Sequence, residues 1–118
     1  MRGIDQMIIK DIPMPKAGKK EVLVKLEYVG ICGSDVHYFH HGNCGAYKVD
    51  LSNDYMLGHE CAGTVVAVGE DVTNLKAATR VALEPGITCG TCEFCKSGRY
   101  NLCPDVVFLA TPPVQGCY

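Results

Sequence analysis

The sequence contains no apolar run long enough to cross a membrane and no cluster of basic residues. Its apolar stretches are short and interrupted by glycine, whereas a membrane-spanning helix needs about 20 consecutive apolar residues. Lysine and arginine are scattered, with no basic run longer than Lys19–Lys20, and the formal net charge is −2. We therefore expect neither a membrane partner nor a nucleic-acid partner.

Two further absences bear on compartment and domain content. The first residues contain no continuous apolar segment of the signal-peptide type, so the eight cysteines are read as metal ligands and reduced thiols of a cytoplasmic protein. No G-x-G-x-x-G pattern and no second set of βα units occur, so we expect no NAD site within this sequence. A length of 118 residues suits one domain, spanning residues 1–118.

Four cysteines near the C-terminal end form the strongest local pattern. Two overlapping C-x-x-C units are followed by a fourth cysteine, giving Cys89, Cys92, Cys95 and Cys103. Four thiolates in tetrahedral reach suit Zn²⁺ with no open position, which is typical of a structural site. The alternatives are a disulfide pair or free buried thiols. We predict a structural-zinc lobe over residues of about 87–105.

The pattern of apolar residues predicts short strands separated by glycine turns. Residues 21–29 alternate, with Val22 and Tyr28 on one mostly buried face. Further strands are expected at 57–69, 79–84 and 106–110, with a short helix over 34–39 and a polar loop over 40–54. Such a series is typical of an all-β barrel or sandwich.

A second group of metal-binding residue types consists of Cys32 and the pair His59–Glu60. A cysteine, a histidine and a carboxylate can hold a zinc ion and leave a position for water or substrate. The alternative interpretation is a buried thiol and an unrelated histidine–glutamate pair at the surface.

Three motifs resemble the zinc-containing medium-chain alcohol dehydrogenases. They are G-H-E-x-x-G-x-x-x-x-x-G-x-x-V at 58–72, G-I-C-G-S-D-x-H at 30–37, and the four-cysteine lobe. The amino-acid sequence at 29–38, 83–86, 98–101 and 110–113 resembles that of the sorbitol/xylitol (polyol) dehydrogenase branch. The resemblance covers the chain from about residue 8 to 118.

This resemblance implies a mainly β, GroES-like, partly open barrel with short helices and a zinc lobe, without the nucleotide-binding Rossmann domain. It also implies a catalytic zinc held by Cys32, His59 and either Glu60 or a water. By the same resemblance, Asp35 orients the zinc-bound histidine.

The resemblance assigns further roles around that metal. Ser34 would take the substrate proton, and His37 would pass it to solvent. Tyr38 and Phe108 would line the substrate pocket. Each residue also has an ordinary interpretation: a helix cap for Ser34, a surface imidazole for His37, and core aromatics for the other two.

Several other residues are expected to have no role in the chemistry. His40 and His41 are interpreted as solvated loop residues. Cys44, Cys61 and Cys117 are interpreted as free thiols. The family has Lys-Pro-Gly-Asp-Arg where this chain has 76–80, which lacks the proline and glycine, so we expect a different or looser turn there.

The function implied by the resemblance is NAD-linked oxidation of a secondary alcohol of a polyol to a ketone, with zinc lowering the pKa of the hydroxyl. We expect the full-length enzyme to be a homo-oligomer, and this chain to be inactive by itself because it lacks the NAD-binding domain. A stand-alone, non-catalytic zinc-binding module is the alternative from another class. A related threonine or alcohol dehydrogenase is the enzymatic alternative.

Overall fold

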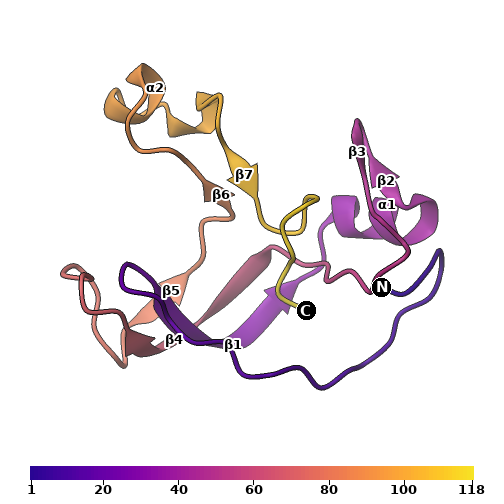
Figure 1. The fold of residues 1–118 in the computed structure, drawn as a ribbon, viewed down its shortest axis with the longest axis horizontal. Helices are drawn as coiled ribbons and strands as arrows, with labels where there is room; N and C mark the ends of the chain where they lie inside the picture. Colours follow the sequence, from indigo (N-terminus) through magenta and orange to yellow (C-terminus); the bar gives the residue numbers. More distant parts are fainter.

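The computed structural model describes all 118 residues as a mainly β protein with open sheets and short helices (Figure 1). The elements are, in order, β1 (Val22–Gly30), α1 (Gly33–His41), β2 (Asn43–Cys44), β3 (Tyr47–Lys48), β4 (Glu60–Val68), β5 (Arg80–Ala82), β6 (Gly86–Ile87), α2 (Glu93–Lys96), the 3-10 helix η1 (Tyr100–Leu102) and β7 (Val107–Phe108). The mainly β prediction is confirmed. No helix combines the length and apolar character that a bilayer span requires.

The largest sheet is antiparallel, with strand order β1-β4-β5. Its strands approach so closely that a Cβ on Gly63 would lie 2.1 Å from the Lys25 carbonyl oxygen, so only glycine fits there. The pairing of β1 with β4 is irregular between Leu26 and Tyr28. Tyr28 is 70% exposed, and its predicted place on a buried face is therefore wrong.

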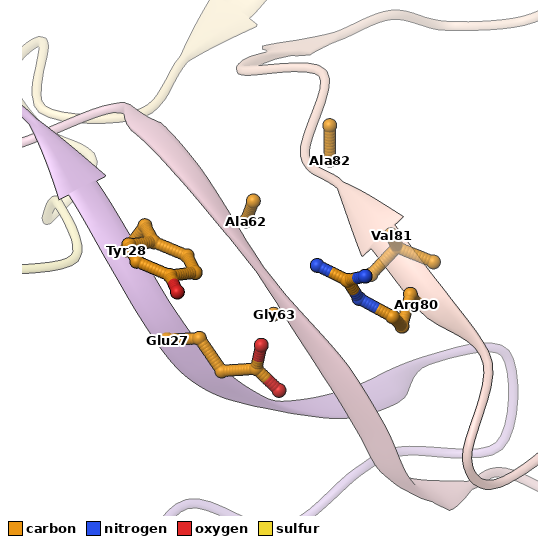
Figure 2. Close-up of a pocket in the computed structure, with 7 residues that line it drawn as sticks. All are labelled: Glu27, Tyr28, Ala62, Gly63, Arg80, Val81 and Ala82. Carbon is orange, nitrogen blue, oxygen red and sulfur yellow. The ribbon is translucent and has the colours of Figure 1, made fainter.

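A pocket of about 270 Å³ lies on this sheet (Figure 2). Glu27 and Tyr28 from β1 and Arg80 from β5 surround it, over the small residues Ala62 and Gly63 of β4. The pocket contains none of the predicted site residues.

Helix α1 extends further than the sequence analysis predicted. It begins after Cys32, whose backbone N–H donates to the Asp35 carboxylate at 3.1 Å, and it continues through His41. Gly42, at φ 69°, ends it by donating its N–H to the Tyr38 carbonyl at 2.7 Å. This left-handed glycine is a common helix terminator. The prediction that His40 and His41 lie in a loop is therefore wrong: both belong to α1, where both are exposed.

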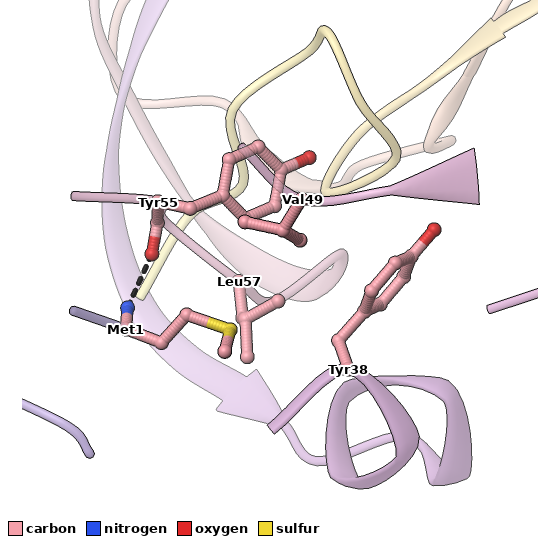
Figure 3. Close-up of a cluster of buried hydrophobic side chains, with 5 residues drawn as sticks. All are labelled: Met1, Tyr38, Val49, Tyr55 and Leu57. Carbon is pink, nitrogen blue, oxygen red and sulfur yellow. Dashed lines mark hydrogen bonds between the residues drawn. The ribbon is translucent and has the colours of Figure 1, made fainter. Parts of the chain in front are cut away.

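The buried core is small and lies beside α1. Its cluster consists of Met1, Tyr38, Val49, Tyr55 and Leu57 (Figure 3). The Met1 ammonium donates to the Tyr55 carbonyl, and the Tyr55 hydroxyl donates to the Val114 carbonyl at 2.6 Å. Because 14 of 118 residues are buried, much apolar surface stays exposed.

Part of that surface forms a groove between the N-terminal segment and the end of β1. Residues 7–17 have no regular secondary structure, and Ile9 is fully exposed while Ile12 is 56% exposed. The groove has a volume of about 730 Å³, and Ile31, Leu57 and Tyr118 line its other side.

The turn before β5 is tight. Thr79 donates its backbone N–H to the Lys76 carbonyl at 3.2 Å, and Ala78 takes φ 68°. The turn is not looser, because it is closed by a hydrogen bond and places alanine where glycine is favoured. That it differs from the turn of the family stays a prediction.

The cysteine-containing segment projects from the rest of the chain as a separate lobe, with α2 at its tip (Figure 1). Its base is closed by the antiparallel pairing of β6 with β7, in which Gly86 lies opposite Phe108 and Ile87 opposite Val107. The chain therefore leaves and re-enters the main body at one place, which allows the lobe to be organised locally.

Candidate functional site

The register of β1 against β4 brings Cys32 to His59 and Glu60. Gly30, the last residue of β1, pairs with Glu60, the first residue of β4. Cys32 comes two residues after the end of β1 and His59 comes directly before the start of β4, so both lie at the same end of the strand pair. The ligand atoms of Cys32, His59 and Glu60 all lie within 4.8 Å of one another. Gly30 leaves room for the carboxylate, since a Cβ there would lie 2.8 Å from Glu60 Oε2.

Asp35 lies directly behind this cluster and is 3% exposed. Its Oδ2 accepts from the Cys32 N–H at 3.1 Å, and its Oδ1 accepts from the Gly58 N–H at 3.0 Å. The same Oδ1 lies 3.5 Å from His59 Nδ1, slightly beyond an ordinary hydrogen bond. This is the arrangement expected of a carboxylate that orients a metal-binding imidazole.

Tyr118 completes the surroundings of Asp35, and the sequence analysis gave it no role. Its hydroxyl donates to the Gly30 carbonyl at 3.0 Å and to Asp35 Oδ2 at 3.1 Å. Burial, followed by the negative charge of Asp35, raises the pKa of Tyr118. Its ring covers Gly58, where a Cβ would lie 2.6 Å from Tyr118 Cδ1 and where φ is 89°.

Ser34 and His37 lie on α1, after Cys32. Ser34 is half-buried in the first turn, and His37 is exposed. His37 Nδ1 lies 2.7 Å from the Asn43 carbonyl oxygen; because a carbonyl only accepts, Nδ1 carries the proton and Nε2 is free. No hydrogen bond joins Ser34 to His37, and their relay stays a prediction.

The two predicted pocket aromatics have different surroundings. The ring of Phe108, 37% exposed, meets the His59 ring edge-on with centroids 5.4 Å apart, so Phe108 borders the Cys32–His59–Glu60 cluster. Tyr38 is 3% exposed and packs in the core cluster, and burial raises its pKa. The pocket roles of both residues stay predictions.

The four cysteines of the lobe converge as their spacing predicts. Their sulfurs all lie within 4.8 Å of one another, with Cys89 and Cys95 at 4.0 Å and Cys92 and Cys95 at 3.5 Å. Zn–S bonds of about 2.3 Å in a tetrahedron separate the sulfurs by about 3.8 Å. The donor set and its spacing therefore fit Zn²⁺. All eight cysteines are free thiols, so the disulfide alternative is not what the structure shows.

Hydrogen bonds support the thiolate form of one of these cysteines, Cys89. Cys89 Sγ accepts from the backbone N–H of Thr91 at 3.4 Å and of Cys92 at 3.3 Å. The Thr91 hydroxyl donates to the same sulfur at 3.5 Å. These hydrogen bonds, with that of the hydroxyl first, lower the pKa of Cys89 to about 6. A thiol that ionises this readily is prepared to bind a metal near neutral pH.

The remaining cysteines lie outside both clusters. Cys61 is 5% exposed and packs inside β4, in line with its interpretation as a small hydrophobe. Burial, followed by a contact with Cys61, raises the pKa of Cys117 to about 12. Cys44 packs against the core cluster.

Comparison with known proteins agrees with this geometry. Residues 18–118 match the model of the family described as the alcohol dehydrogenase GroES-like domain. A sorbitol dehydrogenase of Bacillus subtilis is 53% identical over 118 residues, which is 100% of this chain and 33% of the relative. A probable D-xylulose reductase A of Arthroderma otae is 50% identical over 117 residues, covering 98% of this chain and 32% of the relative.

Solved structures share the fold. A crystal structure of an Escherichia coli oxidoreductase/dehydrogenase of unknown specificity superposes with a TM-score of 0.86 at 50% identity, covering 98% of this chain and 33% of that chain. The alcohol dehydrogenase of Thermus sp. ATN1 gives 0.84 at 32% identity, covering 99% and 34%. The chain spans about a third of the length of the curated relatives it matches. It belongs to the alcohol dehydrogenase GroES-like domain family, as its three motifs predicted.

Proposed function

We propose that this chain is the substrate-side, zinc-binding domain of an NAD-linked polyol dehydrogenase that oxidises a secondary alcohol to a ketone. Residues 1–118 form one GroES-like domain, with its zinc lobe over residues of about 87–105. The structural zinc ligands are Cys89, Cys92, Cys95 and Cys103. The catalytic zinc ligands are Cys32, His59 and Glu60.

The observation that carries this proposal is the convergence of Cys32, His59 and Glu60, with ligand atoms within 4.8 Å and Asp35 Oδ1 3.5 Å from His59 Nδ1. Three protein ligands leave one tetrahedral position for the substrate, which is typical of catalytic zinc. The similarity to a sorbitol dehydrogenase and a D-xylulose reductase supports a polyol as the substrate.

The proposed roles of the side chains combine the family resemblance with the positions of the residues. A zinc ion bound here supplies Lewis-acid polarisation that makes the substrate hydroxyl more acidic. Asp35 holds His59 in one orientation, and Phe108 walls the side of the cluster next to that ring. Ser34 would accept the substrate's hydroxyl proton while releasing its own, and His37, whose Nε2 makes no hydrogen bond within the protein, would carry the released proton to solvent.

Oxidation of the alcohol also requires a nicotinamide nucleotide to accept the hydride. Residues 1–118 contain no Gly-rich nucleotide motif, so we propose that hydride transfer requires a nucleotide-binding domain in addition and that these residues alone are inactive. Similar solved structures contain NADP or NADH. We also propose a homo-oligomer and a cytoplasmic location, where thiolate ligands stay reduced.

The test uses the polypeptide that carries these residues together with any that follow Tyr118 in its gene. NADH formation with sorbitol or xylitol is followed at the absorbance of reduced nicotinamide. We expect turnover that Cys32→Ser abolishes while the lobe keeps its zinc, and that Cys44→Ser, outside both clusters, leaves intact. Full turnover of the Cys32→Ser protein would remove this cluster from the chemistry.

The same experiment tests the rival functions. A protein that binds zinc in the lobe but oxidises no alcohol would be a non-catalytic zinc module. Turnover of threonine or of simple alcohols in preference to polyols would identify the related enzymatic branch.

A further inference from the structure

Helix α1 carries a pair of histidines, His37 and His41, that belongs to neither of the two cysteine-containing clusters. His37 and His41 are four residues apart on this helix, so their side chains lie on the same face. Their ring centroids are 4.5 Å apart, with the planes inclined at 55°. Both residues are exposed, so an ion from solvent can reach them.

The separation of the rings suits two imidazoles that share one metal ion. Metal–nitrogen bonds of about 2.0–2.1 Å, with angles of about 90–110°, place the centres of two bound rings about 4.5–5.2 Å apart. The observed 4.5 Å lies at the short end of that range. Two histidines four residues apart on a helix can therefore bind one ion from the same face.

The hydrogen bonding of the two rings leaves their nitrogens available. His37 Nδ1 donates to the Asn43 carbonyl at 2.7 Å, so that in the neutral ring Nε2 is the nitrogen with a lone pair for a metal. Metal-binding histidines usually donate their second nitrogen to such an acceptor. The His41 ring makes no hydrogen bond within the protein. His40 differs, because its Nδ1 is bound to Asp5 Oδ1 at 2.5 Å.

The end of the helix adds a favourable field. His41 is the last residue of α1, and the aligned peptide dipoles give the C-terminal end of a helix a partial negative charge that favours a cation. The Phe39 and His41 carbonyls at this end already accept hydrogen bonds, from the Asp5 N–H and the Asn43 amide. A divalent ion shared with His37 would lie near this end.

We propose that His37 and His41 form a surface site for a divalent transition-metal ion that prefers imidazole ligands, such as Ni²⁺, Cu²⁺ or Zn²⁺. The site is separate from the two zinc clusters but shares His37 with the proposed proton relay, so that a bound ion would occupy the nitrogen which that relay uses. It is read out by binding alone, so its failure and that of the dehydrogenase function are distinguishable.

The test measures Ni²⁺ binding to the whole chain. The protein is first loaded with Zn²⁺ and dialysed, so that the lobe thiolates are occupied. Every variant also carries Cys32→Ser, so that the second cluster, which dialysis empties, is not the source of the bound Ni²⁺ measured by equilibrium dialysis. We expect His41→Gln and His37→Gln each to weaken Ni²⁺ binding by about tenfold or more, because losing a ligand exceeds the 10–100-fold cost of losing an outer hydrogen-bond partner.

His40→Gln is the matched control, since it removes one exposed histidine from the same helix but leaves the pair intact. We expect it to bind Ni²⁺ like the unaltered chain. Zinc content and circular dichroism must be equal in all variants, so that a loss of binding reports the site and not unfolding. Unchanged Ni²⁺ binding in His41→Gln, or an equal loss in His40→Gln, would overturn the proposal.

Discussion

Replacing Asp35 with asparagine probes the group that joins helix α1 to the candidate catalytic cluster. Oδ1 accepts from the Gly58 N–H and faces His59 Nδ1, while Oδ2 accepts from the Cys32 N–H and the Tyr118 hydroxyl. An amide has one acceptor oxygen. In the Asp35→Asn protein, one of these two sets of donors therefore faces an NH₂ group.

The magnitude follows from the burial of this carboxylate, which is 3% exposed. A hydrogen bond to a charged group contributes about 1.5–3 kcal/mol, and a buried donor left without a partner costs about 1–3 kcal/mol. We expect a loss of about 3 kcal/mol in unfolding free energy, which lowers Tm by about 10 °C for a domain of this size. Zinc affinity at the Cys32–His59–Glu60 cluster should fall about 10–100-fold, because His59 loses its orienting partner.

Thermal unfolding measures the change in Tm. Competition with a chelating dye for the zinc ion bound at the Cys32–His59–Glu60 cluster measures the change in zinc affinity. Tyr118→Phe is the matched control: it removes one donor and leaves the carboxylate beside His59. We expect it to cost about 1.5 kcal/mol, the lower end of the range for a bond to a charged group, because Tyr118 is 41% exposed, and to leave zinc affinity nearly unchanged. Wild-type Tm and zinc affinity in the Asp35→Asn protein would refute this reasoning.

Four further variants test the backbone and the core. Ala78→Gly should raise the unfolding free energy by about 1 kcal/mol, because glycine takes the φ of 68° without strain, whereas Ala77→Gly should lower it by about 0.5–1 kcal/mol; equal effects in urea unfolding would contradict this. Gly58→Ala should cost about 2 kcal/mol or more, since its φ is 89° and its Cβ would meet the Tyr118 ring, and a wild-type Tm would argue against that packing. Burial raises the pKa of Tyr55 to about 12. Above pH ~10 the unfolded chain loses this proton before the folded one does, so the contribution of Tyr55 to the unfolding free energy is present below pH ~10 and declines by about 1.4 kcal/mol per pH unit toward pH ~12. Tyr55→Phe should therefore lose less stability than wild type between pH ~9 and ~11, and parallel losses in urea unfolding would contradict the shift.

Local patterns predicted the elements and clusters that depend on nearby residues. The four lobe cysteines lie within fifteen positions of the sequence, so their spacing alone indicates a shared ion. The alternation in residues 21–29 indicates a strand, and β1 occupies Val22–Gly30. The end of α1 also had a signal: Gly42 follows His41, and a glycine after a helical stretch commonly marks its end.

Features that depend on long-range contacts left no such signal. The meeting of Cys32 with His59 rests on the β1–β4 register, which the sequence analysis reached only through the family resemblance. Tyr118 contacts Asp35 across 83 positions, and no motif includes it. Tyr28 was misplaced because an irregularity in strand pairing changes which side chains face outward.

The account depends on four thiolates that organise the lobe beside the candidate catalytic cluster. X-ray absorption at the zinc edge tests it most directly, on protein dialysed until only tightly bound metal remains. We expect about one zinc per chain with four sulfur neighbours at about 2.3 Å, and loss of that signal in Cys92→Ser. A first coordination shell of nitrogen or oxygen, or a signal unchanged in Cys92→Ser, would contradict the account.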